Sequence, residues 1–354
     1  MKNLEKYRTL LDDEVDGLLL TSRYSRHYGA EFDIAEGVAL VTKEAALYFT
    51  DSRYIESALN NIKGFTVTEM NRANPYNKLI NDAIAELNIE KLGYEEGYMT
   101  VSELQSYEAN LQAALVPFGD KINSFRSVKE PWELDRIRKA QEITDKAFSE
   151  VLTRIKTGMT EKQLQAELIY CLYKNGGEGL SFDPIVVSGP NTSLPHGVAT
   201  DRVIREGDFI TMDFGAIYGG YCADMTRTVA VGYATEEMKK VYNTVLAAQE
   251  AGIAISKAGI TGSAIDGAAR QLIADAGYGA FFGHGYGHCI GMECHEMPSC
   301  SPSGARQMEV NMVSSAEPGI YLPGKFGVRI EDLIIFTTDG YENITASPKN
   351  LIII

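Results

Sequence analysis

The pattern of apolar and polar residues in the first third of the chain is typical of alternating strands and helices. Short apolar runs bounded by polar residues occur at 17–21 (GLLLT), 37–42 (GVALVT) and 46–50 (ALYFT), and each predicts a buried strand. A polar stretch at 121–129 (KINSFRSVK) then ends this region. Together these features predict an N-terminal α/β domain.

A helical pattern begins after the polar stretch. From Leu134 to Ile155, apolar residues recur at helical spacing, which predicts a helix that begins near Pro131 and buries one face. We therefore place the domain boundary near residue 126. The expected domains are residues 1–125 and residues 126–354.

A weak internal repeat divides the second domain. Gly158-Met159-Thr160 and Gly259-Ile260-Thr261 lie 101 residues apart, and each closes a helical segment. A glycine, Gly176 or Gly277, follows 16 residues after each threonine. The pattern indicates two copies of one unit, each continuing into glycine-rich strand candidates that contain acidic residues.

Two of these acids fall in a predicted β-hairpin. Residues 208–214 (DFITMDF) and 221–231 (YCADMTRTVAV) are strand-like, and turn residues separate them. A hairpin centred on residues 218 and 219 would place Asp213 directly opposite Asp224, on the same face. Each aspartate alone is typical of a turn or a surface. Two opposed carboxylates repel, however, so this register predicts a metal ion between them.

Four of the five histidines lie in motif-like contexts: His196, His284, His288 and His295. The segment 283–291 (GHGYGHCIG) has glycines at alternate positions, which discourage a helix and permit close backbone approach. No second histidine stands four residues after His295, so the zinc helix motif HExxH is excluded. A lone histidine is usually structural, but this concentration near acidic strands indicates a reaction centre.

Two further acids complete the candidate metal ligands. Glu317 precedes a Pro-Gly turn in 314–321 (SSAEPGIY). Glu331 alternates with Arg329 on one face of 328–332 (VRIED), so Arg329 is a candidate partner for a ligand carboxylate. A structural salt bridge of Arg329 is an equally good interpretation, and the two do not exclude one another.

Composition limits what such a site can serve. The 33 Lys and Arg against 48 Asp and Glu leave a net charge of −15, which opposes polyanionic partners. We therefore expect neither nucleic acid nor membrane as a partner. The charged N-terminus and the lack of a run of roughly 20 apolar residues argue against a signal peptide and a membrane span. Five cysteines without a CxxC pair fit a reducing compartment, so we expect a cytoplasmic protein.

Taken together, the motifs resemble the metallopeptidases that cleave before proline, the aminopeptidase P and prolidase group. The resemblance covers essentially the whole chain and implies an α+β protein: a C-terminal pita-bread domain preceded by a smaller creatinase-like domain. The motifs that carry it are 182–198 (FDPIVVSGPNTSLPHGV), 212–215 (MDFG), 223–228 (ADMTRT), 283–288 (GHGYGH), 295–298 (HEMP), 316–319 (AEPG), 328–332 (VRIED) and, in the N-terminal half, 49–54 (FTDSRY).

The resemblance implies a role for each candidate. Asp213 would bind one of two divalent metal ions, Asp224 and Glu331 would bridge them, and His288 and Glu317 would complete the second. Manganese is the implied metal, with cobalt, iron and zinc as alternatives, and the oxygen-rich ligand set agrees. Such ions would activate a water and stabilise the oxyanion.

Protons and substrate would be handled by residues around the ions. Glu317 would also shuttle a proton, and His295 would donate to the oxyanion. His196 and His284 would line the pocket for proline. The resemblance further implies a homodimer in which the N-terminal domain borders the neighbouring subunit's site.

Ser299 bears on the choice between the two peptidase classes of this group. Dipeptidases commonly have an arginine here that could clamp the substrate's terminal carboxylate. Its replacement by serine favours an aminopeptidase acting on longer peptides with proline at the second position, with the Xaa-Pro dipeptidase as the alternative. A metal-free creatinase-like enzyme and a catalytically silent binding module would both show degraded ligands, whereas all five are intact here.

Overall fold

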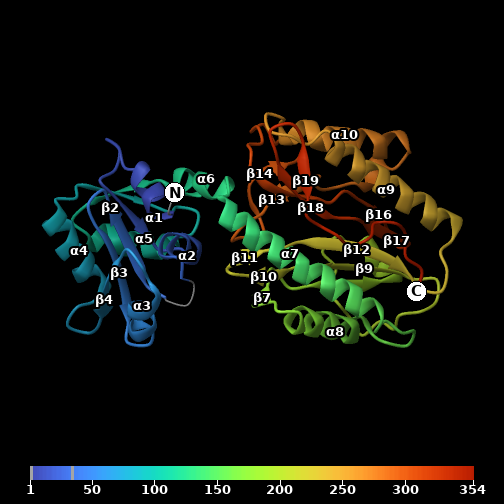
Figure 1. Cartoon of the computed structure of the whole chain (residues 1–354), viewed down its shortest axis with the longest axis horizontal. Helices are drawn as coiled ribbons and strands as arrows, with labels where there is room; N and C mark the ends of the chain where they lie inside the picture. The colour runs from blue at the N-terminus through green and yellow to red at the C-terminus, as the bar shows by residue number, and fades with distance from the viewer. Residues whose placement is uncertain (1–2, 33–35) are drawn as a thin grey trace. The chain divides into compact units, whose positions relative to one another are not determined.

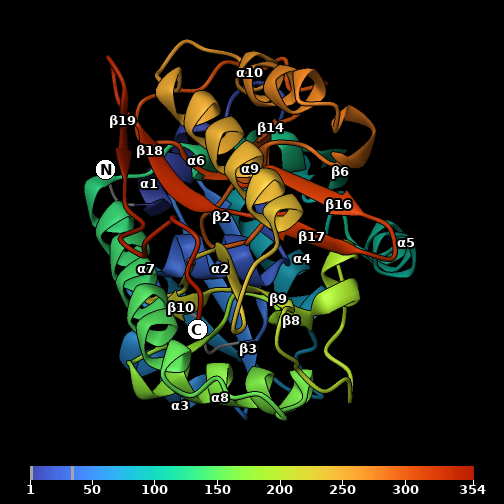
Figure 2. The ribbon, with the colours of Figure 1, turned by 90° about the vertical axis from the view of Figure 1, so that its right-hand side faces the viewer.

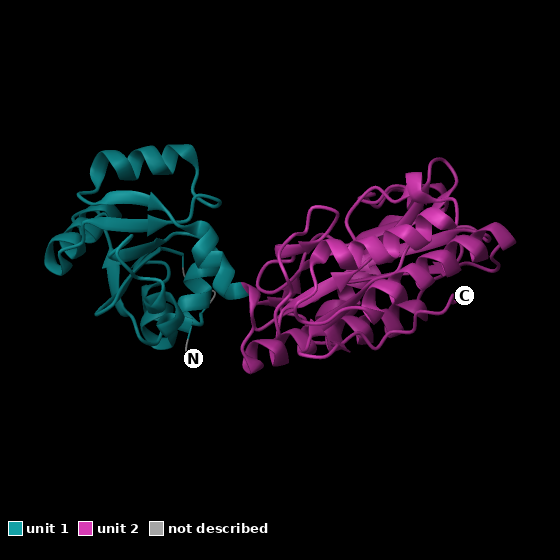
Figure 3. Ribbon diagram, turned by 90° about the horizontal axis from the view of Figure 1, so that it is seen from above, with its two compact units in different colours: residues 1–126 teal, residues 127–354 magenta. Residues whose placement is uncertain are grey.

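The computed structural model describes residues 3–32 and 36–354, which form two compact units, Met1–Arg126 and Ser127–Ile354. Figure 3 colours these two units separately. The expected boundary near residue 126 falls at the end of a helix rather than in an extended linker, because Ile122 within the polar stretch is buried. In the described part of the chain, no helix is long and apolar enough to cross a membrane.

Unit 1 is an α/β domain built on a six-stranded sheet of order β4-β3-β2-β1-β5-β6. Strand β1 lies in the middle of this order because its leucines are apolar on both faces, and it pairs antiparallel with β2 and parallel with β5. All three predicted strands are present as β1, β2 and β3. The elements of unit 1, seen in Figure 1, are α1 Asn3–Thr9, β1 Gly17–Leu20, α2 Arg23–Ala30, β2 Val38–Thr42, β3 Ala46–Asp51, α3 Ile55–Asn61, β4 Thr66–Met70, α4 Tyr76–Leu87, β5 Lys91–Tyr94, α5 Val101–Asn110, β6 Ala114–Pro117 and α6 Gly119–Ser127.

Unit 2 places two pairs of helices outside a set of antiparallel strands, as Figures 1 and 2 show. The sheet orders are β11-β10-β7, β12-β9-β8, β14-β13-β15-β18-β19 and β16-β17. Its helices are α7 Pro131–Leu152, α8 Glu161–Lys174, α9 Glu236–Ala254 and α10 Gly262–Asp275, with short 3-10 turns at Gly189–Ser193 and Gly279–Phe281. Its strands are β7 Gly179–Leu180, β8 Ile185–Ser188, β9 Phe209–Phe214, β10 Ala216–Tyr218, β11 Tyr221–Cys222, β12 Met225–Ala230, β13 Gly287–Cys289, β14 Glu296–Cys300, β15 Val313–Ala316, β16 Gly319–Leu322, β17 Phe326–Arg329, β18 Asp332–Phe336 and β19 Tyr341–Asn343.

The helix predicted after the polar stretch is α7. Pro131 occupies its first turn, where the missing N–H costs nothing, and the side chain of Glu133 accepts a hydrogen bond from the Glu130 N–H at 2.8 Å. The face that carries Leu134 and Ile137 is buried, as the spacing predicts. Further along the helix, Ile143, Ala147 and Val151 pack with α8 against β9 and β12, which carry or flank the first two acids.

The repeat has a counterpart in the local structure. Thr160 caps α8 and Thr261 caps α10, and both helices contain 14 residues. In both copies the glycine two residues earlier has a positive φ, 92° at Gly158 and 85° at Gly259. Each threonine also forms an isolated antiparallel bridge with a later segment. The two halves of unit 2 therefore begin their second helix in the same way.

Candidate metal centre and active site

All nine predicted site residues line one cavity of about 450 Å³ in unit 2. They are His196, Asp213, Asp224, His284, His288, His295, Glu317, Arg329 and Glu331. Phe182, Ile185 and Pro195 add apolar walls, and Ser299 and Ser301 add hydroxyls. The cavity therefore joins an acidic group to a small apolar surface.

The five candidate ligands come from strands or from residues next to strand ends. Asp213 lies in β9 and His288 in β13, whereas Asp224 immediately precedes β12. Glu317 follows β15 and Glu331 precedes β18, and these two strands pair through Ala316 and Asp332. Each half of unit 2 thus contributes two carboxylates.

The predicted hairpin register was wrong by two residues. Asp213 pairs with Thr226, and the turn is centred on Gly219 and Gly220, so Asp224 stands opposite Gly215. The reason is backbone conformation: both turn glycines have positive φ, as a tight two-residue hairpin turn requires, and this moves the centre by one residue. The shift keeps both aspartates on one face, as diagonal rather than direct neighbours.

Glycines permit the close backbone approach that brings the ligands together. A Cβ on Gly215 would lie 1.8 Å from the Ala223 carbonyl oxygen, beside Asp224. A Cβ on Gly287 would lie 2.2 Å from the Ser315 carbonyl oxygen, where β13 approaches the strand that leads to Glu317. The GHGYGH segment is therefore non-helical and leads into β13 at Gly287, where it packs closely against its neighbour, as its glycines predict.

Three of the carboxylates have a buried oxygen that would be stabilised by a cation. Asp213 Oδ1, Asp224 Oδ1 and Glu331 Oε1 are buried, and within the described residues none of these atoms has a hydrogen-bond partner. Ligand atoms of Asp224, His288 and Glu331 all lie within 4.8 Å of one another. Unpaired buried carboxylate oxygens are costly. This donor set fits divalent cations, which accept several oxygens and one imidazole.

Electrostatics lead to the same conclusion. Burial raises the pKa of Asp224 and of Glu331 well above the usual range, and neighbouring carboxylates raise both further. Burial also raises the pKa of Asp213, and this outweighs the opposing effect of the nearby Arg329 guanidinium. Without a cation, burial and mutual repulsion therefore oppose ionisation of these three carboxyl groups.

His288 and Glu317 form the complementary pair. The Nε2 of His288 lies 3.1 Å from Glu317 Oε1 and 3.6 Å from Asp224 Oδ2. Burial lowers the pKa of His288, but the Glu317 hydrogen bond and the two negative charges raise it to about 9. Burial raises the pKa of Glu317, but His288 lowers it to about 2. The surroundings of Nε2 therefore favour a positive charge there, either a proton or a metal ion.

A chain of hydrogen bonds holds the remaining carboxylate and one histidine. Arg329 donates to Asp213 Oδ2 at 2.5 Å and to the Tyr321 hydroxyl at 2.8 Å. That hydroxyl lies 2.9 Å from His284 Nε2, while His284 Nδ1 lies 2.8 Å from the Gly285 carbonyl. Nδ1 must donate to this carbonyl, so Nε2 accepts from Tyr321. His284 is then neutral, in agreement with a pKa lowered by burial. Both interpretations of Arg329 hold, since its salt bridge is made to a candidate ligand.

His196 and His295 are exposed in the cavity lining. The imidazole of His295 lies near that of His288, with ring centroids 4.2 Å apart and a tilt of 41°. Burial lowers the pKa of His295, and the positive charge of His288 lowers it further. A neutral imidazole here can donate a hydrogen bond to a substrate oxygen.

Several partners of the site were not among the predicted residues. Thr226 donates to Glu331 Oε2 at 2.6 Å and Ser315 donates to Glu317 Oε1 at 3.0 Å. The Cys294 thiol donates to Asp224 Oδ2 at 3.2 Å. Thr226 lies within the motif at 223–228 and Tyr321 ends the segment 314–321, and strand alternation from Asp224 could have identified Thr226. Cys294 directly precedes the motif at 295–298, but nothing in the local sequence indicates that its thiol reaches Asp224.

The comparisons with known proteins agree with this geometry. Residues 135–338 match metallopeptidase family M24, and residues 4–128 match the creatinase/prolidase N-terminal domain. The chain is 34% identical over 356 residues to the Xaa-Pro dipeptidase of Pyrococcus horikoshii, covering 98% of this chain and 99% of that one.

Two solved structures span the same length. The Xaa-Pro dipeptidase from Bacillus anthracis has a TM-score of 0.96 at 41% identity, covering 100% of this chain and 99% of that one. The X-Pro aminopeptidase from Thermotoga maritima has a TM-score of 0.94 at 37% identity, covering 100% of both chains. The predicted fold class is confirmed, and the chain belongs to metallopeptidase family M24, with a creatinase/prolidase N-terminal domain.

Proposed function

We propose that this protein is a dinuclear-metal-dependent peptidase that hydrolyses the Xaa-Pro bond at the N-terminus of peptides. The observation that carries the proposal is the group of four carboxylates and one imidazole in a single cavity, with three buried carboxylate oxygens that need a cation. The relatives named as Xaa-Pro dipeptidase and X-Pro aminopeptidase support the substrate class.

Five residues would hold the metal ions: Asp213, Asp224, His288, Glu317 and Glu331. Two divalent ions supply Lewis acidity and an activated water. Arg329 fixes the orientation of Asp213, and Thr226 fixes that of Glu331, so the carboxylates are preorganised.

Other residues of the cavity would handle protons and substrate. Glu317 moves a proton between the water and the leaving nitrogen of proline, and His295 donates a hydrogen bond to the oxyanion. His196 and His284, together with Phe182 and Ile185, form the surface for the pyrrolidine ring. A hydrogen-bonded neutral His284 suits this role, because both its nitrogens are already occupied and only the ring face is offered. The tertiary amide nitrogen of an Xaa-Pro bond lacks the N–H that other peptidases can use. An apolar wall suits the pyrrolidine ring that replaces this N–H.

We favour the aminopeptidase over the dipeptidase because of the charges in the cavity. Arg329 is the one Lys or Arg among the described lining residues, and it already donates to Asp213, Tyr321 and the Pro195 carbonyl. Ser299 and Ser301 offer neutral hydroxyls, which suit a continuing peptide better than a terminal carboxylate. The dipeptidase remains the second candidate, supported by the names of two relatives.

The discriminating experiment compares matched peptides. Metal-stripped protein is refilled with Mn²⁺, Co²⁺ or Zn²⁺ and given Xaa-Pro dipeptides and Xaa-Pro-Xaa tripeptides. We expect the tripeptide to have the higher kcat/KM. Cleavage of dipeptides alone would overturn the aminopeptidase assignment, and cleavage of neither substrate with any metal would overturn the peptidase assignment.

We also propose manganese as the working metal, a homodimer and a cytoplasmic location. Oxygen-rich ligands support manganese, with cobalt, iron and zinc as alternatives. The family resemblance supports the homodimer, and sedimentation at twice the chain mass of 38.9 kDa would test it. All five cysteines, each within the described ranges, are free thiols, which supports a reducing compartment.

A further inference from the structure

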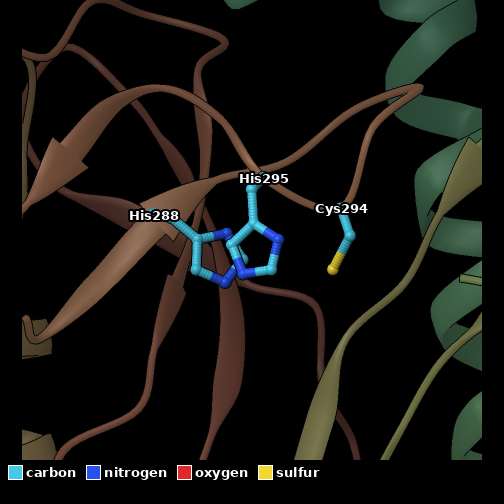
Figure 4. A group of neighbouring side chains, drawn as sticks. All are labelled: His288, Cys294 and His295. Atoms are coloured by element: carbon cyan, nitrogen blue, oxygen red, sulfur yellow. The ribbon is translucent and has the colours of Figure 1, made fainter. Parts of the chain in front are cut away.

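The proposed reaction leaves one side chain of the cavity without a role. Cys294 lies in the loop before β14, and its sulfur is 3.2 Å from Asp224 Oδ2. Figure 4 shows its thiol beside the imidazoles of His288 and His295. The sulfur and one nitrogen of each ring all lie within 4.8 Å of one another. Two imidazoles and a thiol therefore converge at the edge of the carboxylate cluster.

A buried anchor holds the loop that carries two of these groups. Glu296 accepts hydrogen bonds from the N–H groups of Met292 and Glu293, at 3.1 and 3.3 Å. Lys129 donates to the same carboxylate at 2.9 Å, and the two side chains are only 1% and 4% exposed. Cys294 and His295 are thus positioned by a buried ion pair, and their approach to His288 is a built feature of the fold.

The chemistry of this group differs from that of the carboxylate cluster. Thiolate and imidazole are the ligands that zinc and cadmium prefer, whereas manganese prefers carboxylate oxygen. Three such ligands, with the Asp224 carboxylate oxygen within reach of the sulfur, provide the donors of a tetrahedral site. The cavity therefore holds two sets of ligands: carboxylates that favour manganese, and a thiol with two imidazoles that favours zinc or cadmium.

His288 belongs to both sets of ligands, but it can bind only one metal ion at a time. The Nδ1 of His288 lies 3.1 Å from the Cys289 carbonyl oxygen, and a hydrogen bond to a carbonyl requires Nδ1 to carry the proton. Only Nε2 is left to bind a metal, and one nitrogen binds one ion. An ion on the thiol side therefore excludes an ion held by His288 with Asp224 and Glu331.

We propose that His288, Cys294 and His295 form a soft-metal site for Zn²⁺ or Cd²⁺ whose occupation withdraws His288 from the hydrolytic centre. Binding forms a metal–sulfur bond and releases the thiol proton to solvent. Because His295 is engaged at the same time, excess zinc inhibits the peptidase. This last consequence rests on the proposed function, whereas metal binding by the three side chains does not.

The test uses Cd²⁺ alone, added to the metal-free full-length protein, with ultraviolet absorption of the cadmium–thiolate bond as the readout. We expect the wild-type protein to show one equivalent of this absorption. Cys294→Ser should lose it, and Cys171→Ala, which removes a buried thiol of helix α8 that does not line the cavity, should keep it. His295→Gln should keep the absorption but weaken Cd²⁺ binding by at least about tenfold, the loss expected from disturbing a metal's partners.

Two results would overturn the proposal. One is the absence of the absorption in the wild-type protein. The other is its full persistence in Cys294→Ser, which is nearly the same size as cysteine and is checked for folding by circular dichroism. Peptide hydrolysis with Mn²⁺ is measured separately, so a failure of the proposed function would leave the cadmium result interpretable. Prior addition of Mn²⁺ should lower the apparent Cd²⁺ affinity, and an unchanged affinity would refute the exclusion argument.

Discussion

The replacement Asp224→Asn tests the metal centre most directly, because it should change stability in opposite directions with and without metal. Asp224 is 4% exposed and its Oδ1 has no hydrogen-bond partner among the described residues. Asparagine keeps the shape and removes the charge. The metal-free protein should therefore gain stability, and the metal-loaded protein should lose it.

The structure gives the size of the first effect. Glu331 has a carboxylate oxygen within 4.8 Å of one from Asp224, a repulsion of roughly 3 kcal/mol at an effective dielectric constant near 20. The attraction to a protonated His288 Nε2, 3.6 Å away, is about 5 kcal/mol on the same scale. Burial and two further carboxylates, Asp213 and Glu317, add to the unfavourable side, and their sum raises the pKa of Asp224. We expect Asp224→Asn to raise the free energy of unfolding of the metal-free protein by about 1–3 kcal/mol.

The sign depends on pH in a defined way. A carboxyl group whose pKa is raised by folding binds its proton more tightly in the folded state, so its ionised form weakens the fold as pH rises through that pKa. The advantage of Asp224→Asn should therefore be small at and below the unfolded pKa of about 3.9 and grow as the pH rises above it. Urea unfolding of both metal-free proteins across this range measures it.

With metal bound, we expect the wild-type protein to be more stable than Asp224→Asn. An ion at a hundredfold its Kd stabilises the wild-type protein by about 2.7 kcal/mol, roughly 5–10 °C in Tm for a domain of this size. Asp224→Asn should show a much smaller shift with Mn²⁺ and lose at least about 10²-fold in kcat. Asp183→Asn, which removes the same charge from an exposed residue of the lining, is the matched stability control. Equal stabilisation of Asp224→Asn and wild type by Mn²⁺ would refute the assignment of Asp224 as a ligand.

Three further replacements test other parts of the argument. Ser299→Arg introduces a cation in the cavity lining, so kcat/KM for Xaa-Pro dipeptides should rise relative to tripeptides, and an unchanged ratio in peptide assays would count against the carboxylate argument. Lys129→Met leaves Glu296 buried without its cation and should cost about 3–5 kcal/mol in urea unfolding, whereas Lys129→Met with Glu296→Gln should recover part of the loss. Burial raises the pKa of Asp332, but the charges of Arg227 and Lys349 outweigh it and lower this pKa. The ionised Asp332 therefore stabilises the fold above the unfolded pKa of about 3.9, and this stabilisation is lost as the pH falls through the lower folded pKa. Asp332→Asn should therefore flatten the acid limb of the unfolding free energy against pH, and an unchanged slope would contradict the shift.

Local sequence predicts the site well where chemistry and backbone rules act over short distances. The strands of unit 1 and the buried face of α7 follow from apolar spacing, and the non-helical GHGYGH segment follows from its glycines. The hairpin register failed because the prediction placed Tyr218 and Gly219 in the turn, whereas both turn positions need a positive φ, which Gly219 and Gly220 adopt without strain.

The residues that position the site could not be predicted from local sequence, for a different reason. Lys129 and Glu296 are 167 residues apart, and nothing near either residue indicates that they meet in the core. Cys294 likewise is 70 residues from Asp224, and its neighbours Glu293 and His295 do not indicate that contact. Such partners are decided by tertiary packing, which joins segments far apart in the chain, so only the folded structure identifies them.

The repeat explains why the centre depends on the whole of unit 2. Asp213 and Asp224 belong to the first copy, and Glu317 and Glu331 to the second, while Thr226 and Arg329 cross between the copies to reach Glu331 and Asp213. Without a cation these four carboxylates repel one another where the copies meet. A bound metal ion attracts carboxylates of both copies and so joins them. Metal binding should therefore stabilise the junction between the copies more than either copy alone, and hydrogen exchange with and without Mn²⁺ should show its largest protection in β9, β12, β15 and β18, which carry or flank the four acids.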